Sequence, residues 1–110
     1  MAMTIVDPAE NREYCLEFNR RTVAKTEQAG FDINKIDSMV MTMVPKLFWG
    51  AFLMHHPYMK QEQTDKILFE GLGGLTSKEM EALGELYAAP LKSLVSEEKE
   101  GNPRPMAVKM

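Results

Sequence analysis

The part of this sequence that most restricts its fold is the apolar stretch 39–54, MVMTMVPKLFWGAFLM. Twelve of its 16 residues are apolar, and Lys46 is the one charged residue. A single helix face is marked by residues at the spacing i, i+3, i+4, i+7, i+8 and i+11: Val44, Leu47, Phe48, Ala51, Phe52 and His55. Crossing a membrane takes about 20 apolar residues, and the run is closed earlier by His55-His56-Pro57. The stretch therefore predicts a central helix buried in a globular core, with no membrane span.

Length and charge limit the class of protein. With 110 residues, the chain is expected to form one domain over residues 1–95, followed by a loosely ordered tail over residues 96–110. The net charge of −3 argues against a general nucleic-acid binder, because DNA-binding proteins usually carry basic excess. Cys15 is the single cysteine and cannot form an internal disulfide. Without a signal-peptide pattern, the cytoplasm is the expected compartment.

The first third of the chain predicts a hairpin and a helix. Residues 3–18 alternate in polarity around a turn at 7–11, and Tyr14, Leu16 and Phe18 form one apolar face. An isolated two-stranded ribbon is only marginally stable, so this face must pack on helices. Asn19 is the expected N-cap of a helix over residues 20–29. Gly30 and Phe31 are expected to close that helix in a Schellman motif.

The remaining helices are predicted from caps and apolar spacing. Thr42 is the expected N-cap of the central helix, which places Pro45 in its first turn. A short helix over residues 61–70 is expected to bury Ile67, Leu68 and Phe69. The capping-box spacing of Thr76 and Glu79 starts a last helix, which Pro90 should kink or split. That helix is expected to bury Met80, Leu83, Tyr87, Leu91 and Leu94.

The predicted fold class is thus α+β and mostly α, with an N-terminal β-hairpin packed on about four helices around the central apolar helix. No catalytic arrangement is found in the sequence. His55 and His56 are adjacent and point about 100° apart on a helix, unlike paired metal ligands. Cys15 is expected between the carboxylates of Glu13 and Glu17, which oppose a reactive thiolate. We therefore expect no enzyme, no metal and no cofactor.

Several segments, taken in order, carry a family resemblance: EYCLEFNRRTV at 13–23, GFDI at 30–33, MTMVPKLFWGAF at 41–52, the two histidines, and LYAAPL at 86–91. Together they resemble a family of small phage and prophage proteins from Gram-positive hosts. The genes of that family lie among tail genes, and in that setting its members resemble tail assembly chaperones. The likeness covers about residues 12–95. Trp49 departs from it, since a small residue is expected at this position.

The resemblance implies a non-enzymatic chaperone or scaffold in the bacterial cytoplasm. It would cover apolar helical segments of a tape-measure protein and help to recruit subunits of the major tail protein, and a homo-oligomer is compatible with this role. The Met-rich stretch 39–43 and the residues expected to contact the partner would form the binding surface. Those residues are Arg20, Arg21, Phe48, Trp49, Phe52, His55 and His56.

Two alternatives stay open. The apolar members of this set could simply be core residues, since Met and aromatic side chains at helical spacing usually fill a core. A small nucleic-acid-binding or regulatory phage protein could instead use the basic face of the first helix, formed by Arg20, Arg21 and Lys25 together with Arg12. That alternative predicts DNA binding that weakens steeply with salt, whereas the chaperone predicts none.

Overall fold

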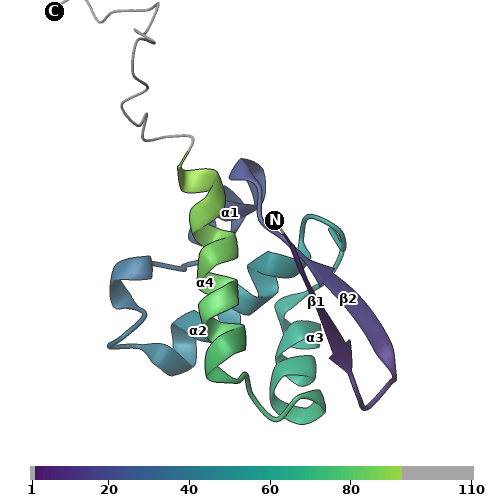
Figure 1. The fold of residues 1–110 in the computed structure, drawn as a ribbon. Helices are drawn as coiled ribbons and strands as arrows, with labels where there is room; N and C mark the ends of the chain where they lie inside the picture. Colours follow the sequence, from purple (N-terminus) through teal and green to yellow (C-terminus); the bar gives the residue numbers. More distant parts are fainter. Residues whose placement is uncertain (1, 93–110) are drawn as a thin grey trace, which may run out of the picture.

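The structure is a computed structural model that describes residues 2–92, and its fold is α+β and mostly α, as predicted (Figure 1). The predicted tail over residues 96–110, the domain end at residue 95 and the apolar position Leu94 lie outside the described residues. Among residues 2–92, no helix combines the length and the apolar character that crossing a membrane requires. The elements are strands β1 (Met3–Asp7) and β2 (Arg12–Leu16) and helices α1 (Arg20–Gln28), α2 (Val40–Phe52), α3 (Gln61–Lys66) and α4 (Ser77–Leu91), with a 3₁₀ turn at Ile33–Lys35 and a π-helical turn at Ile67–Gly71.

The hairpin buries one face, as the alternation predicts. β1 and β2 pair antiparallel, with Ile5 opposite Tyr14 and Asp7 opposite Arg12. Ile5, Tyr14 and Leu16 are buried, because alternate residues of a strand share a face and this face covers helices. The chain leaving β2 is bonded to α2, since the Glu17 N–H donates to the Ala51 carbonyl at 2.9 Å.

Both predicted ends of α1 are confirmed. The Asn19 side chain accepts from the Thr22 N–H at 2.8 Å, and the Asn19 N–H donates to the Thr22 hydroxyl at 2.9 Å. At the other end Gly30 has a φ of 109°, which a residue without a Cβ adopts at little cost. Its N–H donates to the Glu27 carbonyl at 2.9 Å, and the Phe31 N–H reaches the Thr26 carbonyl at 3.2 Å. This is the Schellman pattern, and Phe31 is buried beneath it.

The central helix α2 begins earlier and ends earlier than predicted. Met39, not Thr42, is its N-cap, so Pro45 is the sixth helical residue rather than part of the first turn. The missing Pro45 N–H would have bonded the carbonyl of Met41, a residue exposed to water, so its loss costs little. The helix ends at Phe52, and His55 is exposed instead of continuing the buried face.

The core is built around α2, which contacts α1, α3, α4 and β2 (Figure 1). Leu47, Phe48, Ala51 and Phe52 are at most 1% exposed, as the helical spacing predicts. The rings of Phe48 and Phe52 meet edge to face with centroids 5.0 Å apart. The remaining core residues come from both strands, α1, the π-helical turn, α4 and the loops, and include Leu16, Val23, Phe31, Leu68, Leu83 and Tyr87.

The segment after α3 differs from the prediction. α3 continues into the π-helical turn, where the Leu72 N–H donates to the Ile67 carbonyl five residues earlier, at 2.8 Å. Ile67 and Leu68 are buried as predicted, but Phe69 is 47% exposed and the prediction for it is wrong. Three consecutive helical residues are spread over about 200° around the axis, so Phe69 points away from the face that Ile67 and Leu68 bury.

The last helix begins as predicted and passes through its proline. Thr76 accepts from the Glu79 N–H at 3.1 Å, and Glu79 accepts from the Thr76 N–H at 2.8 Å. Leu83 and Tyr87 are buried, Met80 and Leu91 are half-buried, and Leu86 is a further core residue. Pro90 lies inside α4 and does not split it after Ala89. Because only Leu91 follows within the helix, one lost hydrogen bond at this end does not stop the winding.

Raising the pH above 10 is expected to destabilise the fold through Tyr87. Its hydroxyl donates to a Glu27 carboxylate oxygen at 3.1 Å. Burial first, then this hydrogen bond and the charges of Glu27 and Asp32, raise the pKa of Tyr87 from 10.0 to about 12. The folded state therefore disfavours the tyrosinate. Its contribution to the free energy of unfolding is complete below pH 10 and is lost as the pH rises through about 12. Urea unfolding across this window measures the loss.

The matched variants are Tyr87→Phe and Tyr58→Phe. Tyr87→Phe should flatten the dependence on pH, because the titrating hydroxyl is gone. Tyr58 is 93% exposed, so Tyr58→Phe should leave the slope as in the parent chain. An unchanged slope in Tyr87→Phe would show that other groups cause the alkaline loss of stability.

Candidate functional site

The residues predicted to contact a partner do not form a single surface. Phe48 and Phe52 lie in the core, whereas the others reach solvent to different degrees. Trp49 and His56 are half-buried, and three polar residues are exposed: Arg20, Arg21 and His55.

Phe48 and Phe52 face the interior of the domain. Both are 0% exposed, and Phe52 also packs against Tyr14 with ring centroids 5.2 Å apart. A partner could touch these rings only if the core opened. Their burial supports the alternative that this pair belongs to the core. A partner would therefore have to contact other parts of α2.

Trp49 is anchored at the edge of the core. Its indole N–H donates to the Met59 carbonyl at 2.9 Å, so the ring joins α2 to the segment that precedes α3. This bond satisfies the polar atom of a half-buried indole. The large side chain, at a position where the resemblance suggests a small one, is thereby held against the domain instead of pointing freely into solvent.

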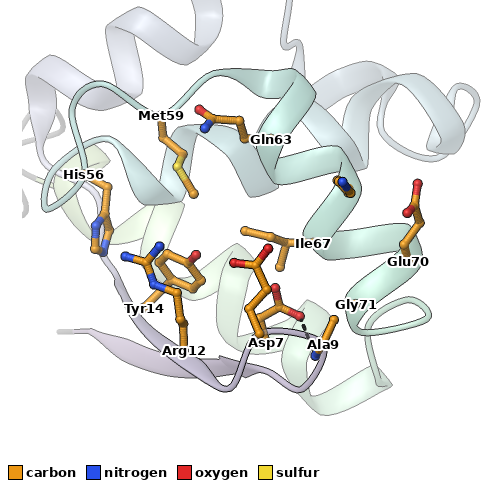
Figure 2. Close-up of a pocket in the computed structure, with 12 residues that line it drawn as sticks. Asp7, Ala9, Arg12, Tyr14, His56, Met59, Gln63, Ile67, Glu70 and Gly71 are labelled. Carbon is orange, nitrogen blue, oxygen red and sulfur yellow. Dashed lines mark hydrogen bonds between the residues drawn. The ribbon is translucent and has the colours of Figure 1, made fainter.

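A polar cavity of about 370 Å³ lies between the hairpin turn and the face of α3 and the π-helical turn (Figure 2). Asp7 is 4% exposed at its floor and accepts from the Ala9 N–H at 3.0 Å. The Arg12 guanidinium lies over the Tyr14 ring, 5.4 Å from its centroid. The charged and polar lining residues are Asp7, Glu10, Arg12, Tyr14, His56, Gln63, Lys66 and Glu70.

His56 lines this cavity as a packed ring rather than as a cation. The ring meets Tyr14 edge to face with centroids 5.3 Å apart. Burial first, then the charges of His55 and Arg12, lower the pKa of His56 below its ordinary value. A lowered pKa favours the neutral form of this imidazole. The cavity combines acidic and basic groups, so its charge favours neither an anionic nor a cationic ligand.

A second hollow is apolar, and we call it the apolar groove. It encloses about 240 Å³ between the start of α2, the π-helical turn and the start of α4. Much of its lining is open to solvent, since Met41 is 75%, Val40 50% and Phe69 47% exposed. The groove is lined by Val40, Met41, Val44, Pro45, Leu68, Phe69, Gly74, Leu75 and Met80.

Local backbone geometry creates the apolar groove. Gly73 and Gly74 have φ values of 69° and 102°, which reverse the chain after the π-helical turn. The Gly74 N–H donates to the Leu68 carbonyl at 2.8 Å and closes this reversal. Sequence reasoning proposed the Met-rich stretch 39–43 for partner contact, and Val40 and Met41 of that stretch line the groove. It missed the part of the lining that Phe69 supplies, because it expected this ring to be buried.

A third feature gathers three possible metal ligands. Cys15, Glu17 and His55 bring a sulfur, a carboxylate oxygen and a ring nitrogen within 4.8 Å of one another. The His55 Nε2 atom lies 2.8 Å from a Glu17 oxygen. Spacing in the sequence gave no indication of this cluster, because its members lie on segments 38 residues apart that meet only in the folded chain.

The fold and these surfaces define a small α+β domain with an exposed apolar groove. The chain belongs to the family described as Domain of unknown function (DUF5055), which matches residues 1–110. Comparisons with curated proteins and with solved structures found no match.

Proposed function

We propose that this chain is a non-enzymatic chaperone or scaffold of phage tail assembly. It would cover apolar helical segments of a tape-measure protein and help to recruit subunits of the major tail protein. The phage setting rests on the resemblance of the sequence segments described above. The observation that carries the binding role is the apolar groove, whose most exposed residue is a methionine on the central helix.

The chemistry of the groove suits a helical client. Amphipathic helices are bound in apolar grooves through side chains repeated every three or four residues. Methionine adapts its shape to different apolar partners, which a chaperone that covers several segments requires. Met39 and Val40 extend the exposed apolar surface beside Met41, at 43% and 50% exposure. The net charge of −3 would help to keep a complex with an apolar client in solution.

The alternative function is weaker. Arg20, Arg21 and Lys25 are exposed on α1, as a nucleic-acid contact requires. However, the acidic side chain of Glu27 lies on the same helix, and the overall charge is negative. Phosphate neutralisation supplies most of the affinity of such proteins, so a small basic face on an acidic domain favours the chaperone reading.

Co-expression tests the proposal. The tape-measure protein should be insoluble alone and soluble with this chain, and the pair should elute together in size-exclusion chromatography; the major tail protein is tested in the same way. The double variant Met41→Glu and Phe69→Glu places two carboxylates in the groove. It should weaken the complex at least about 30-fold, the equivalent of losing one binding hot spot of about 2 kcal/mol.

The matched control is Tyr58→Glu, which adds a carboxylate at a 93% exposed aromatic outside the groove. It should leave both the complex and the melting temperature unchanged. The double variant should keep a melting temperature close to that of the parent chain, because Met41 is 75% and Phe69 47% exposed. If the double variant still keeps the tape-measure protein soluble, the contact lies outside the groove. If the parent chain associates with neither tail protein, the proposed function is wrong.

A further inference from the structure

We infer that Cys15, Glu17 and His55 form a binding site for a divalent zinc ion with three protein ligands. This site is independent of the apolar groove and of the proposed function.

The three donor atoms are placed close to the geometry that zinc requires. Cys15 is the last outward-facing residue of β2, and Glu17 is the first residue after the strand. Residues two positions apart in an extended chain point to the same side. All donors lie within 4.8 Å of one another. Tetrahedral zinc holds its ligand atoms about 2.0–2.3 Å away and therefore about 3.4–3.7 Å from one another. The donors thus need to shift by only about 1 Å, which rotation of partly exposed side chains provides.

The closest pair would move apart rather than together. His55 Nε2 and the Glu17 oxygen are 2.8 Å apart, the length of a charge-assisted hydrogen bond. Their side chains are 38% and 24% exposed, so both can move outward to admit an ion between them. Zinc would bind Nε2 of the neutral imidazole, whose ring proton would lie on Nδ1, together with the Glu17 carboxylate and the Cys15 sulfur.

The backbone under the cluster is fixed. The Glu17 N–H donates to the Ala51 carbonyl at 2.9 Å, which joins the segment carrying Cys15 and Glu17 to the last turn of α2. His55 follows that turn, and its N–H donates to the Phe52 carbonyl at 3.2 Å. Leu16 and Phe52, directly beneath, are both 0% exposed. Ligands on such a supported backbone lose little freedom when they bind a metal.

The ligand set favours zinc and a structural or bridging role. A thiolate, an imidazole and a carboxylate together suit a borderline metal, and Ca²⁺ or Mg²⁺ would require oxygen ligands. The Cys15 thiol gives its proton to the solvent when the sulfur binds the ion. Three protein ligands leave a fourth position for water or for a donor from a partner. The cluster lines neither the polar cavity nor the apolar groove, which separates it from any substrate pocket described above.

Titration of the purified full chain with Zn²⁺ under reducing conditions tests the site. We expect one ion per chain and a melting temperature that rises with the concentration of zinc. Co²⁺ in place of Zn²⁺ should give a sulfur-to-metal charge-transfer band. Cys15→Ser should abolish that band. Loss of a group that only supports a metal ligand weakens metal binding about 10–100-fold. Cys15→Ser and His55→Ala each remove a ligand itself, so each should weaken Zn²⁺ binding by more than this.

Glu13→Gln is the matched control for Glu17→Gln. Both remove one carboxylate from the same edge of the hairpin, but only Glu17 belongs to the cluster. Glu13→Gln should bind zinc as the parent chain does, and Glu17→Gln should bind it more weakly. Zinc binding that is the same in Cys15→Ser and the parent chain, or no zinc binding by the parent chain, would overturn the inference. Neither result would alter the co-expression test of the apolar groove.

Discussion

Replacing Phe48 by alanine should lower the free energy of unfolding by about 3–5 kcal/mol. The side chain is 0% exposed and lies in the middle of α2, the helix that most other elements contact. Truncation loses the transfer free energy of the ring and leaves a cavity beside Phe52 that the packed core can fill only in part. Domains of this size are stable by about 5–15 kcal/mol, so this loss is a large fraction of the total stability. Urea denaturation measures the loss.

Phe69→Ala provides the control, because it makes the same chemical change at a 47% exposed position. Most surface substitutions change the free energy of unfolding by no more than about 0.5 kcal/mol. Because the Phe69 ring is partly buried, its loss should cost this amount or slightly more. Its effect should appear instead in binding of the tape-measure protein. Equal losses of stability at both positions would contradict the assignment of Phe48 to the core and of Phe69 to the groove.

Features encoded by neighbouring residues were predictable from the sequence. The Asn19 cap, the Gly30–Phe31 ending of α1 and the Thr76–Glu79 capping box each need only groups within a few residues of one another. The buried face of the hairpin is equally local, since alternation along a strand decides which side chains point inward. These features place most of the elements and therefore the α+β class.

The errors occur where tertiary packing or an unusual winding overrides a local rule. Pro45 was expected in a first turn, but α2 begins at Val40 and contains Pro45 as its sixth residue. Phe69 was expected inside, but it lies in the π-helical turn and is 47% exposed. In the connector before α2, Ile33 is 44% exposed, whereas Ile36 packs against the core. No pattern of polarity signals these outcomes.

The candidate sites were less accessible to sequence reasoning than the fold. The density of methionine indicated an adaptable surface but not its position, which depends on how the turn at Gly73 and Gly74 faces α2. The Cys15, Glu17 and His55 cluster depends on the bond that joins β2 to the end of α2. Two adjacent histidines cannot reveal such a site, because its other ligands are distant in the sequence.

Gly50→Ala should lower the free energy of unfolding by about 1–3 kcal/mol, although alanine favours a helix. α1 and α2 cross at Gly50, where an added Cβ would lie 2.9 Å from the Cβ and Cγ2 atoms of Thr26 and closer still to its hydroxyl. Thr26 is 0% exposed, and its hydroxyl donates to the Thr22 carbonyl at 2.7 Å, so its rotamer is held. The two helices must therefore separate. Thermal and urea unfolding measure the cost.

The controls distinguish this clash from a general effect of alanine. Gly84 lies inside α4 with no atom within 4 Å of the position of an added Cβ, so Gly84→Ala should stabilise the domain by up to about 1 kcal/mol. Thr26→Ala removes the two outer atoms of the clash. The double variant with Gly50→Ala should therefore be more stable than the sum of the single changes predicts. If the losses of stability in Thr26→Ala and Gly50→Ala were additive in the double variant, residues 26 and 50 would not be in close contact. Helices α1 and α2 would then lie farther apart than in this structure.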